Sequence, residues 1–139
     1  MARANMIRME NQRAATPKKR VLVVDDDLEL TVLYEKLLED HYEVSTVSDG
    51  TLALKEVLYQ DVDAILCDLR MPELEGDLFY LAVERAKPEL CHRFIFITGA
   101  AEEPKYHSFL SQVKAPVLHK PLQPAKLLAE LQKLLAPRV

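Results

Sequence analysis

The sequence is poor in the residues that build several common kinds of site. It has two cysteines, Cys67 and Cys91, and four scattered histidines, and neither set has the spacing of metal ligands. Glycine occurs only three times, and we interpret Gly50 and Gly76 as residues of special backbone conformation rather than parts of a phosphate-binding loop. These shortages exclude a cysteine-based metal site, and they favour free thiols in a reducing cytoplasm.

The chain also lacks long apolar segments. No run approaches the roughly 20 apolar residues that a membrane helix needs. The N-terminus contains arginines but no apolar core of a secretory signal. With 139 residues, 49% of them hydrophobic and 29% charged, the composition is typical of one globular domain, and we predict a cytoplasmic protein.

Charge is distributed unevenly along the chain. Residues 1–20 carry six Lys or Arg and one Glu, a net charge of +5, whereas the whole chain has −4, so the remainder carries −9. The polar segment 15–19 predicts a boundary between a basic, disordered tail (residues 1–19) and one domain (residues 20–136). Because the domain is acidic, we expect no direct DNA binding by its folded part.

Apolar runs alternate with helical patterns after the tail. Continuous aliphatic runs are typical of strands that are buried on both faces. The predicted strands cover residues 20–24, 42–47, 63–68, 93–99 and 115–121. The predicted helices include residues 30–38, 48–60, 77–86, 102–113 and 127–135. Five strands that alternate with five helices predict an α/β fold with a parallel sheet and helices on both faces.

Polar residues follow four of the predicted strands. In open parallel sheets, ligands bind beyond the carboxyl ends of the strands. Here those ends carry Asp25, Asp26, Asp68, Thr98 and Lys120. Carboxylates that share a cleft need a cation, and a donor set of oxygens alone favours a hard ion such as Mg²⁺. An aspartate, a cation, a lysine and a hydroxyl together indicate phosphoryl transfer to a carboxylate. The third adjacent acid, Asp27, is interpreted as a helix cap.

Four segments, VVDDD, CDLRMPELEG, ITG and HKP, resemble in order the signature blocks of the receiver domain of two-component response regulators. The resemblance covers about residues 20–136 and is of the single-domain, chemotaxis-regulator-like type. It implies a flavodoxin-like, doubly wound sheet of five parallel strands in the order 2-1-3-4-5, with five helices. It also implies a protein that catalyses only its own phosphorylation and dephosphorylation, and is not otherwise an enzyme.

The resemblance assigns a role to each acid of the site. Asp68 resembles the phospho-accepting aspartate and Asp26 the principal Mg²⁺ carboxylate. Asp25 resembles the acidic partner that acts on the ion through water. The backbone carbonyl of Arg70 falls where the family supplies a further metal ligand.

Thr98 resembles the hydroxyl that turns toward the phosphoryl group, and Lys120 the lysine that pairs with it. Pro121 resembles the residue that follows a cis peptide bond. Two positions depart from the pattern. Val117 stands where the family commonly has an aromatic residue, so the helix around residues 106–109 is another candidate for the output. Arg70 lies two residues after the acceptor, where it is expected to influence phosphoryl lifetime.

The resemblance also implies partners. A sensor histidine kinase or a phosphotransfer protein donates the phosphoryl group. An unknown downstream protein binds the face that runs from the fourth strand to the fifth helix. Formation of a homodimer is left undecided. Two alternatives also stay open: a receiver fragment of a hybrid histidine kinase, and a receiver-like scaffold that works without phosphorylation. A phosphatase of the haloacid dehalogenase type is disfavoured, because Arg70 occupies the position of its second aspartate.

Overall fold

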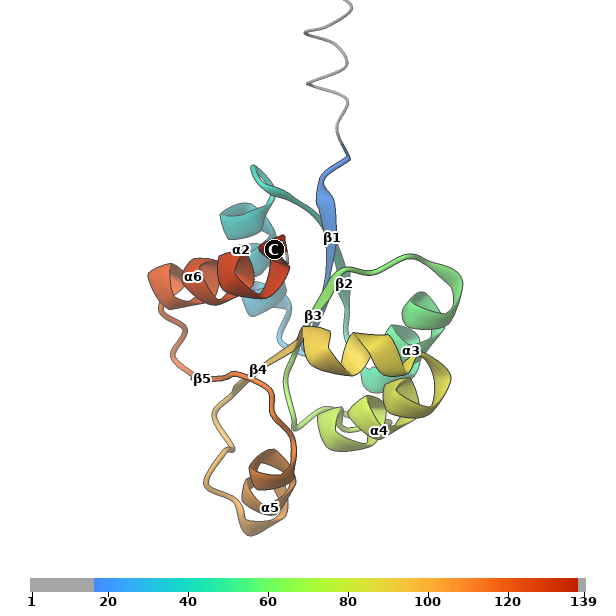
Figure 1. The fold of residues 1–139 in the computed structure, drawn as a ribbon. Coiled ribbons are helices and arrows are strands. Elements are labelled where there is room, and N and C mark those ends of the chain that lie inside the picture. Colours follow the sequence, from blue (N-terminus) through green and yellow to red (C-terminus); the bar gives the residue numbers. More distant parts are fainter. Residues whose placement is uncertain (1–16, 138–139) are drawn as a thin grey trace, which may run out of the picture.

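A computed structural model of the chain describes residues 17–137, which form a parallel sheet between layers of helices (Figure 1). All neighbouring strands are parallel, in the order β2-β1-β3-β4-β5, so the predicted flavodoxin-like fold and strand order are confirmed. The strands are β1 (Lys19–Val24), β2 (Tyr42–Val47), β3 (Ala64–Cys67), β4 (Phe94–Thr98) and β5 (Val117–His119).

Five α-helices connect and follow these strands. They are α2 (Leu28–Leu38), α3 (Gly50–Tyr59), α4 (Gly76–Ala86), α5 (Pro104–Gln112) and α6 (Pro124–Leu135). The described residues also contain a short 3-10 helix that the sequence did not predict, η1 (Pro88–Arg93). In the sequence, Pro88 predicts the end of the helix over residues 77–86. Its fixed φ angle also suits the first position of a new one, and η1 buries Leu90 and Cys91.

The sheet separates two hydrophobic clusters. Helices α2 and α6 cover one face, while α3 and α4 cover the other (Figure 1). The residues of β1 and β3 are buried on both faces from Val21 to Val24 and from Ala64 to Cys67. An aliphatic run without polar alternation is therefore explained by helices on both sides.

The helical spacing of apolar residues predicts one buried face on α2, formed by Leu30, Leu33, Tyr34, Leu37 and Leu38. The face that is buried is narrower. Tyr34 and Leu38 are buried against the sheet, whereas Leu33, expected on the same face, remains 42% exposed. The line of contact runs through residues four apart, and this places Leu33 at its border.

No described glycine has a positive φ angle, so the backbone conformation does not require glycine at residues 50 and 76. Close packing requires Gly50 and Gly76 instead. A Cβ atom on Gly76 would lie 2.1 Å from the carbonyl oxygen of Asp68, and one on Gly50 would lie 2.1 Å from that of Leu74. The interpretation of both glycines as residues of special backbone conformation is corrected accordingly.

The strands β2 and β5 form the two edges of the sheet. β5 has only three residues, and Pro116 and Pro121 flank it. The predicted tail lies outside the described residues except for residues 17–19, and β1 begins at Lys19.

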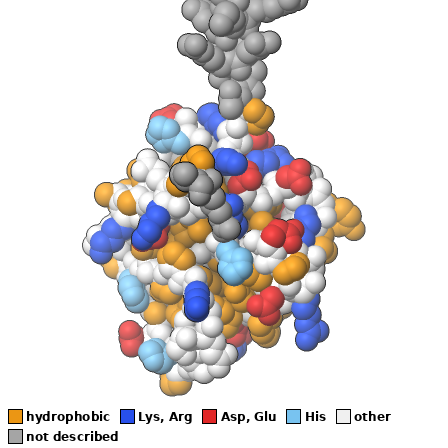
Figure 2. Space-filling view, in the orientation of Figure 1, with side chains coloured by type: hydrophobic (Ala, Val, Ile, Leu, Met, Phe, Trp, Pro, Cys, Tyr) orange, Lys and Arg blue, Asp and Glu red, His pale blue; other side chains and the backbone are white. Residues whose placement is uncertain are grey.

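The surface carries both signs of charge. Within the described part of the face drawn in Figure 2, acidic and basic side chains are interspersed rather than gathered by sign. This face therefore presents no extended basic surface of the kind that nucleic-acid phosphates bind. Among residues 17–137, no helix has both the length and the apolar character that a membrane crossing requires.

Candidate functional site

Two acids lie side by side at the carboxyl edge of the sheet. In the parallel register of β1 and β3, Val24 pairs with Cys67, and the N–H of Asp68 donates to the carbonyl of Val24 at 3.0 Å. Asp25 follows β1 directly and Asp68 follows β3, so the pairing of the strands brings their side chains together. Both are buried, with 2% and 7% of their surface exposed.

Asp26 completes a group of three carboxylates. One oxygen atom from each of Asp25, Asp26 and Asp68 lies within 4.8 Å of the others, and Asp26 is exposed while the other two are buried. All the donors are carboxylate oxygens, which suits Mg²⁺, and an exposed side leaves room for the waters that this ion retains. The residues present therefore fit the predicted ion. The role of the Arg70 carbonyl stays a prediction.

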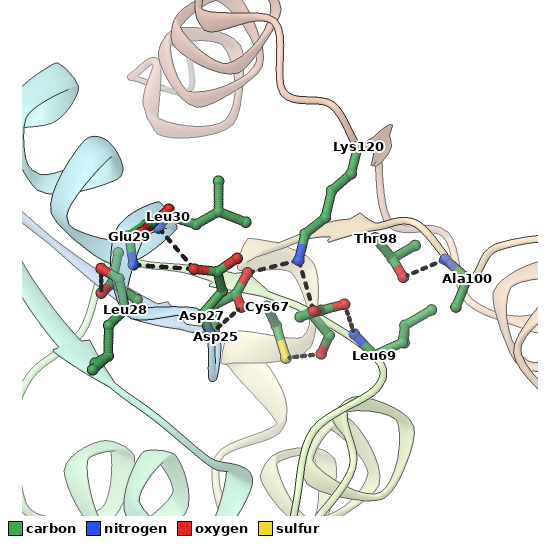
Figure 3. Close-up of polar contacts among 12 residues, drawn as sticks. Asp25, Asp27, Leu28, Glu29, Leu30, Cys67, Leu69, Thr98, Ala100 and Lys120 are labelled. Carbon is green, nitrogen blue, oxygen red and sulfur yellow. Dashed lines mark hydrogen bonds and ion pairs between the residues drawn. The ribbon is translucent and has the colours of Figure 1, made fainter.

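Lys120 extends from the end of β5 into this group (Figure 3). Its Nζ atom donates to Oδ2 of Asp68 at 2.8 Å and lies 3.0 Å from Oδ2 of Asp25. We call the four residues Asp25, Asp26, Asp68 and Lys120 the aspartate cluster. It holds three acids and one lysine, which leaves a surplus of negative charge when all four are ionised.

Burial and hydrogen bonds have opposite effects on the pKa values of Asp25 and Lys120. Burial raises the pKa of Asp25, although the N–H of Asp27 and the ammonium of Lys120 both act to lower it. Burial lowers the pKa of Lys120, but hydrogen bonds to Asp68 and Asp25 outweigh this, and the pKa is raised overall. Lys120 therefore stays protonated, and an added cation would relieve the remaining repulsion.

Asp27 has a different task from its two neighbours. Its Oδ1 atom accepts hydrogen bonds from the N–H groups of Glu29 at 3.0 Å and Leu30 at 3.3 Å, so the predicted helix cap is confirmed. Its own N–H donates to Oδ1 of Asp25 at 2.9 Å. The side chain of Asp27 thus caps helix α2, while the backbone N–H of Asp27 helps to orient Asp25.

Thr98 and Lys120 reach the same edge from neighbouring strands. The N–H of Lys120 donates to the carbonyl of Thr98 at 3.0 Å, and the Lys120–Pro121 peptide is cis, as predicted. Thr98 is fully buried, and its Oγ1 atom accepts the N–H of Ala100 at 3.0 Å. The hydroxyl hydrogen of Thr98 is thus not used in that bond.

The structure also shows contacts that the sequence did not predict. The side chain of Arg70 forms an ion pair with Glu103, the residue before α5. The carboxylate of Glu75 accepts hydrogen bonds from the hydroxyl of Tyr106 and from Nζ of Lys105, the latter at 2.5 Å. These contacts join segments about 30 residues apart through loops, and no periodic pattern in the sequence signals them.

Tyr34 was predicted only as an apolar position of α2. It is 1% exposed, and its hydroxyl is a buried side-chain polar atom without a hydrogen-bond partner among the described residues. Burial raises the pKa of Tyr34, and the negative charge of nearby Asp25 raises it further. The hydroxyl is therefore buried without a partner among the described residues, at a cost in desolvation.

Comparison with solved structures gives the same fold. Chemotaxis protein CheY4 of Vibrio cholerae is 30% identical with a TM-score of 0.74, over 85% of this chain and 99% of that chain. The receiver domain of sensor histidine kinase PA1611 from Pseudomonas aeruginosa is 27% identical with a TM-score of 0.77, over 86% of this chain and 99% of that chain. That structure holds a magnesium ion coordinated in its active site cleft.

Curated relatives are longer proteins. Response regulator SaeR of Staphylococcus epidermidis is 30% identical over 118 residues, which cover 84% of this chain and 50% of that protein. Sensor histidine kinase TmoS of Ectopseudomonas mendocina is 29% identical over 121 residues, which cover 86% of this chain and 12% of that protein. The chain therefore spans half or less of the length of these two relatives. The family model of the response regulator receiver domain matches residues 21–132. This chain belongs to that family.

Proposed function

We propose that Asp68 accepts a phosphoryl group from the phosphohistidine of a sensor histidine kinase or a phosphotransfer protein, in a reaction that depends on Mg²⁺. The observation that carries the proposal is the position of the Asp68 carboxylate. It lies 2.8 Å from the ammonium of Lys120, and one of its oxygen atoms lies within 4.8 Å of carboxylate oxygens of Asp25 and Asp26. A nucleophilic oxygen is thus placed among groups that attract or hold a phosphoryl group.

The proposed step is an in-line displacement. A carboxylate oxygen of Asp68 forms a bond to phosphorus while the bond from phosphorus to the histidine nitrogen breaks, and the imidazole then takes up a proton. Attack of water on the acyl phosphate returns Asp68 and inorganic phosphate. The protein would thus catalyse only its own phosphorylation and dephosphorylation.

Charge on the transferred group is balanced by residues that are already in place. Asp25, Asp26 and Asp68, with the Arg70 carbonyl, would hold Mg²⁺, and the ion would supply positive charge at the phosphoryl oxygens. Lys120 is close enough to pair with the same oxygens, and Thr98 carries a hydroxyl hydrogen that can be donated to them.

The output we propose is a change in the face from β4 to α6, the fifth predicted helix, to which a downstream protein binds. Thr98 ends β4 and is followed by the loop that leads into α5. A new contact to its hydroxyl would therefore act on this face first. Val117 on β5 is partly buried and has no polar side-chain atom. It cannot report the change through a hydrogen bond. A second copy of the chain is one partner that this face could take.

The experiment is chemical labelling of the intact chain. Incubation with Mg²⁺ and acetyl phosphate is expected to add one phosphoryl group, seen by intact mass and removed by hydroxylamine. Asp68→Asn should abolish the label, whereas Asp61→Asn, which changes an exposed loop acid, should leave it unchanged. Equal labelling of Asp68→Asn, or none of the unsubstituted protein, contradicts the proposal.

The similarity to sensor histidine kinase TmoS favours a second candidate, in which this receiver belongs to a hybrid kinase. The chemistry at Asp68 would be the same, but the donor would be a histidine of the same protein. Transfer rates from a panel of phosphorylated kinase and phosphotransfer domains distinguish the two. Binding of a partner that is unaffected by Asp68→Asn would instead favour the phosphorylation-independent scaffold.

A further inference from the structure

We propose that Glu75, Lys105 and Tyr106, here called the Glu75 cluster, transmit the state of Asp68 to helix α5. The inference rests on the proposed phosphorylation of Asp68 and adds the path by which that event reaches the surface. The path starts in the acceptor loop, defined as residues 69–75, and ends in the first turn of α5.

The acceptor loop is attached to Asp68 at both of its ends. At the start, the N–H of Leu69 donates to Oδ1 of Asp68 at 2.7 Å. At the end, the N–H of Gly76 donates to the carbonyl of Leu69 at 2.8 Å, and Gly76 packs against the backbone of Asp68 without room for a Cβ atom. A change in the bonding of the Asp68 carboxylate therefore acts on the residue next to Glu75.

The loop between these ends is tightly turned. Glu73 has a φ angle of 64°, in the left-handed region that residues with side chains rarely adopt. Such a backbone persists only where its surroundings hold it. The loop is thus expected to move as a unit between Asp68 and Gly76.

The first turn of α5 is bound to this loop in two places. Tyr106 is 2% exposed, and its hydroxyl donates to Glu75, which also accepts from Lys105. The ion pair of Arg70 and Glu103 lies at the other end of the loop. Within four residues, α5 and its preceding residue therefore make three polar side-chain contacts with the segment that follows Asp68.

The Glu75 cluster contains an ionised carboxylate at neutral pH. Hydrogen bonds from Lys105 and Tyr106 lower the pKa of Glu75, so its carboxylate stays ionised. Burial and the neighbouring Glu75 raise the pKa of Tyr106 to about 12, so its hydroxyl stays a donor. The contact is therefore a charge-assisted hydrogen bond, and its loss is expected to change the equilibrium for local opening of α5 about tenfold.

Hydrogen exchange of the full chain tests this path. Amide exchange in α5 would be compared with and without Mg²⁺ and beryllofluoride, a mimic of the phosphoryl group. The variants are Tyr106→Phe, Glu75→Gln and the double variant, with Tyr59→Phe as a matched control because Tyr59 is 76% exposed on α3. Labelling by acetyl phosphate would be measured on the same samples.

We expect each single variant to be labelled on Asp68 while the beryllofluoride-dependent change in α5 exchange falls about tenfold. The double variant should lose no more than Glu75→Gln alone, since both substitutions remove the charge-assisted hydrogen bond between Tyr106 and Glu75. Tyr59→Phe should respond like the unsubstituted protein. Undiminished α5 responses in labelled Tyr106→Phe and Glu75→Gln overturn the inference alone, whereas absence of labelling in the unsubstituted protein overturns the proposed function with it.

Discussion

The aspartate cluster and the Glu75 cluster are built from similar parts, yet they differ in charge and burial. Each places the ammonium of a lysine within 3.0 Å of a carboxylate. The aspartate cluster has three acids for its one lysine, and two of those acids are buried. The Glu75 cluster has one acid, and a lysine and a tyrosine hydroxyl both donate to it.

The difference predicts that the aspartate cluster binds an added cation and that the Glu75 cluster does not. In the aspartate cluster, burial raises the pKa of Asp25, whereas in the Glu75 cluster hydrogen bonds lower the pKa of Glu75. The surplus of acid in the first predicts affinity for a divalent cation. The second is internally neutralised, which suits a contact that holds two elements together. The presence of carboxylates alone thus does not define a metal site. The number of carboxylates relative to the lysine and hydroxyl groups that donate to them does.

The largest expected effect comes from Gly76, which follows Glu75 in the sequence and packs against the backbone of Asp68. Gly76→Ala would place a Cβ atom 2.1 Å from the carbonyl oxygen of Asp68, and should lower the free energy of unfolding by about 3 kcal/mol. At Gly99 a Cβ atom would lie 3.9 Å from that of Lys120, an ordinary contact, so Gly99→Ala is the matched control. Urea denaturation measures both, and equal stability of the two variants would contradict the packing argument.

A smaller effect is expected on Mg²⁺ affinity. Asp26→Asn removes one carboxylate of the aspartate cluster and should weaken Mg²⁺ binding at least about tenfold. Glu75→Gln removes a carboxylate that is already paired, and should leave the affinity unchanged. Isothermal titration calorimetry with MgCl₂ measures the two constants. A loss of affinity in Glu75→Gln as large as that in Asp26→Asn would abolish the distinction between the clusters.

Each cluster has a tyrosine nearby, Tyr34 or Tyr106. Removing the hydroxyl should change the free energy of unfolding in opposite directions for these two residues. Tyr106→Phe removes a bond to Glu75 and is expected to lower the free energy of unfolding by about 1 kcal/mol. Tyr34→Phe removes a buried hydroxyl that has no partner among the described residues, and should raise it by about 1 kcal/mol. Thermal and urea unfolding without added metal give both values, and destabilisation by Tyr34→Phe would show that its hydroxyl is satisfied.

The smallest effect concerns pH. The pKa of Glu75 is below its ordinary value of 4.5. Its ionised form therefore stabilises the fold at neutral pH, and that contribution is lost as the pH falls through the lowered value. Carboxyl-carbon NMR should show Glu75 titrating below 4.5, and Lys105→Gln should move it upward because the largest lowering effect is removed. A Glu75 titration that does not change in Lys105→Gln would refute the assigned cause.

The strands and the acids at their ends could be predicted from the sequence because both follow from local patterns. Continuous aliphatic runs identified β1 and β3, and the parallel topology then placed Asp25 next to Asp68. The capping role of Asp27 was likewise local, since it depends on the residues that follow immediately.

Contacts between loops could not be predicted in the same way. Glu75 and Tyr106 are 31 residues apart, and their contact depends on how two irregular segments pack after the sheet has formed. η1 was missed because Pro88 signals the end of one helix and the start of another equally well. The exposure of Leu33 depended on the line of contact of α2, which periodicity specifies only approximately.

The short edge strand β5 has a consequence for how copies of this chain can associate. The three residues of β5, which lie between Pro116 and Pro121, present few free N–H groups, and proline itself donates none. A neighbouring chain would find little backbone with which to extend the sheet, so β5 is protected against edge-to-edge aggregation. Any assembly that uses this side of the domain therefore has to be held by side chains, and can be reversible.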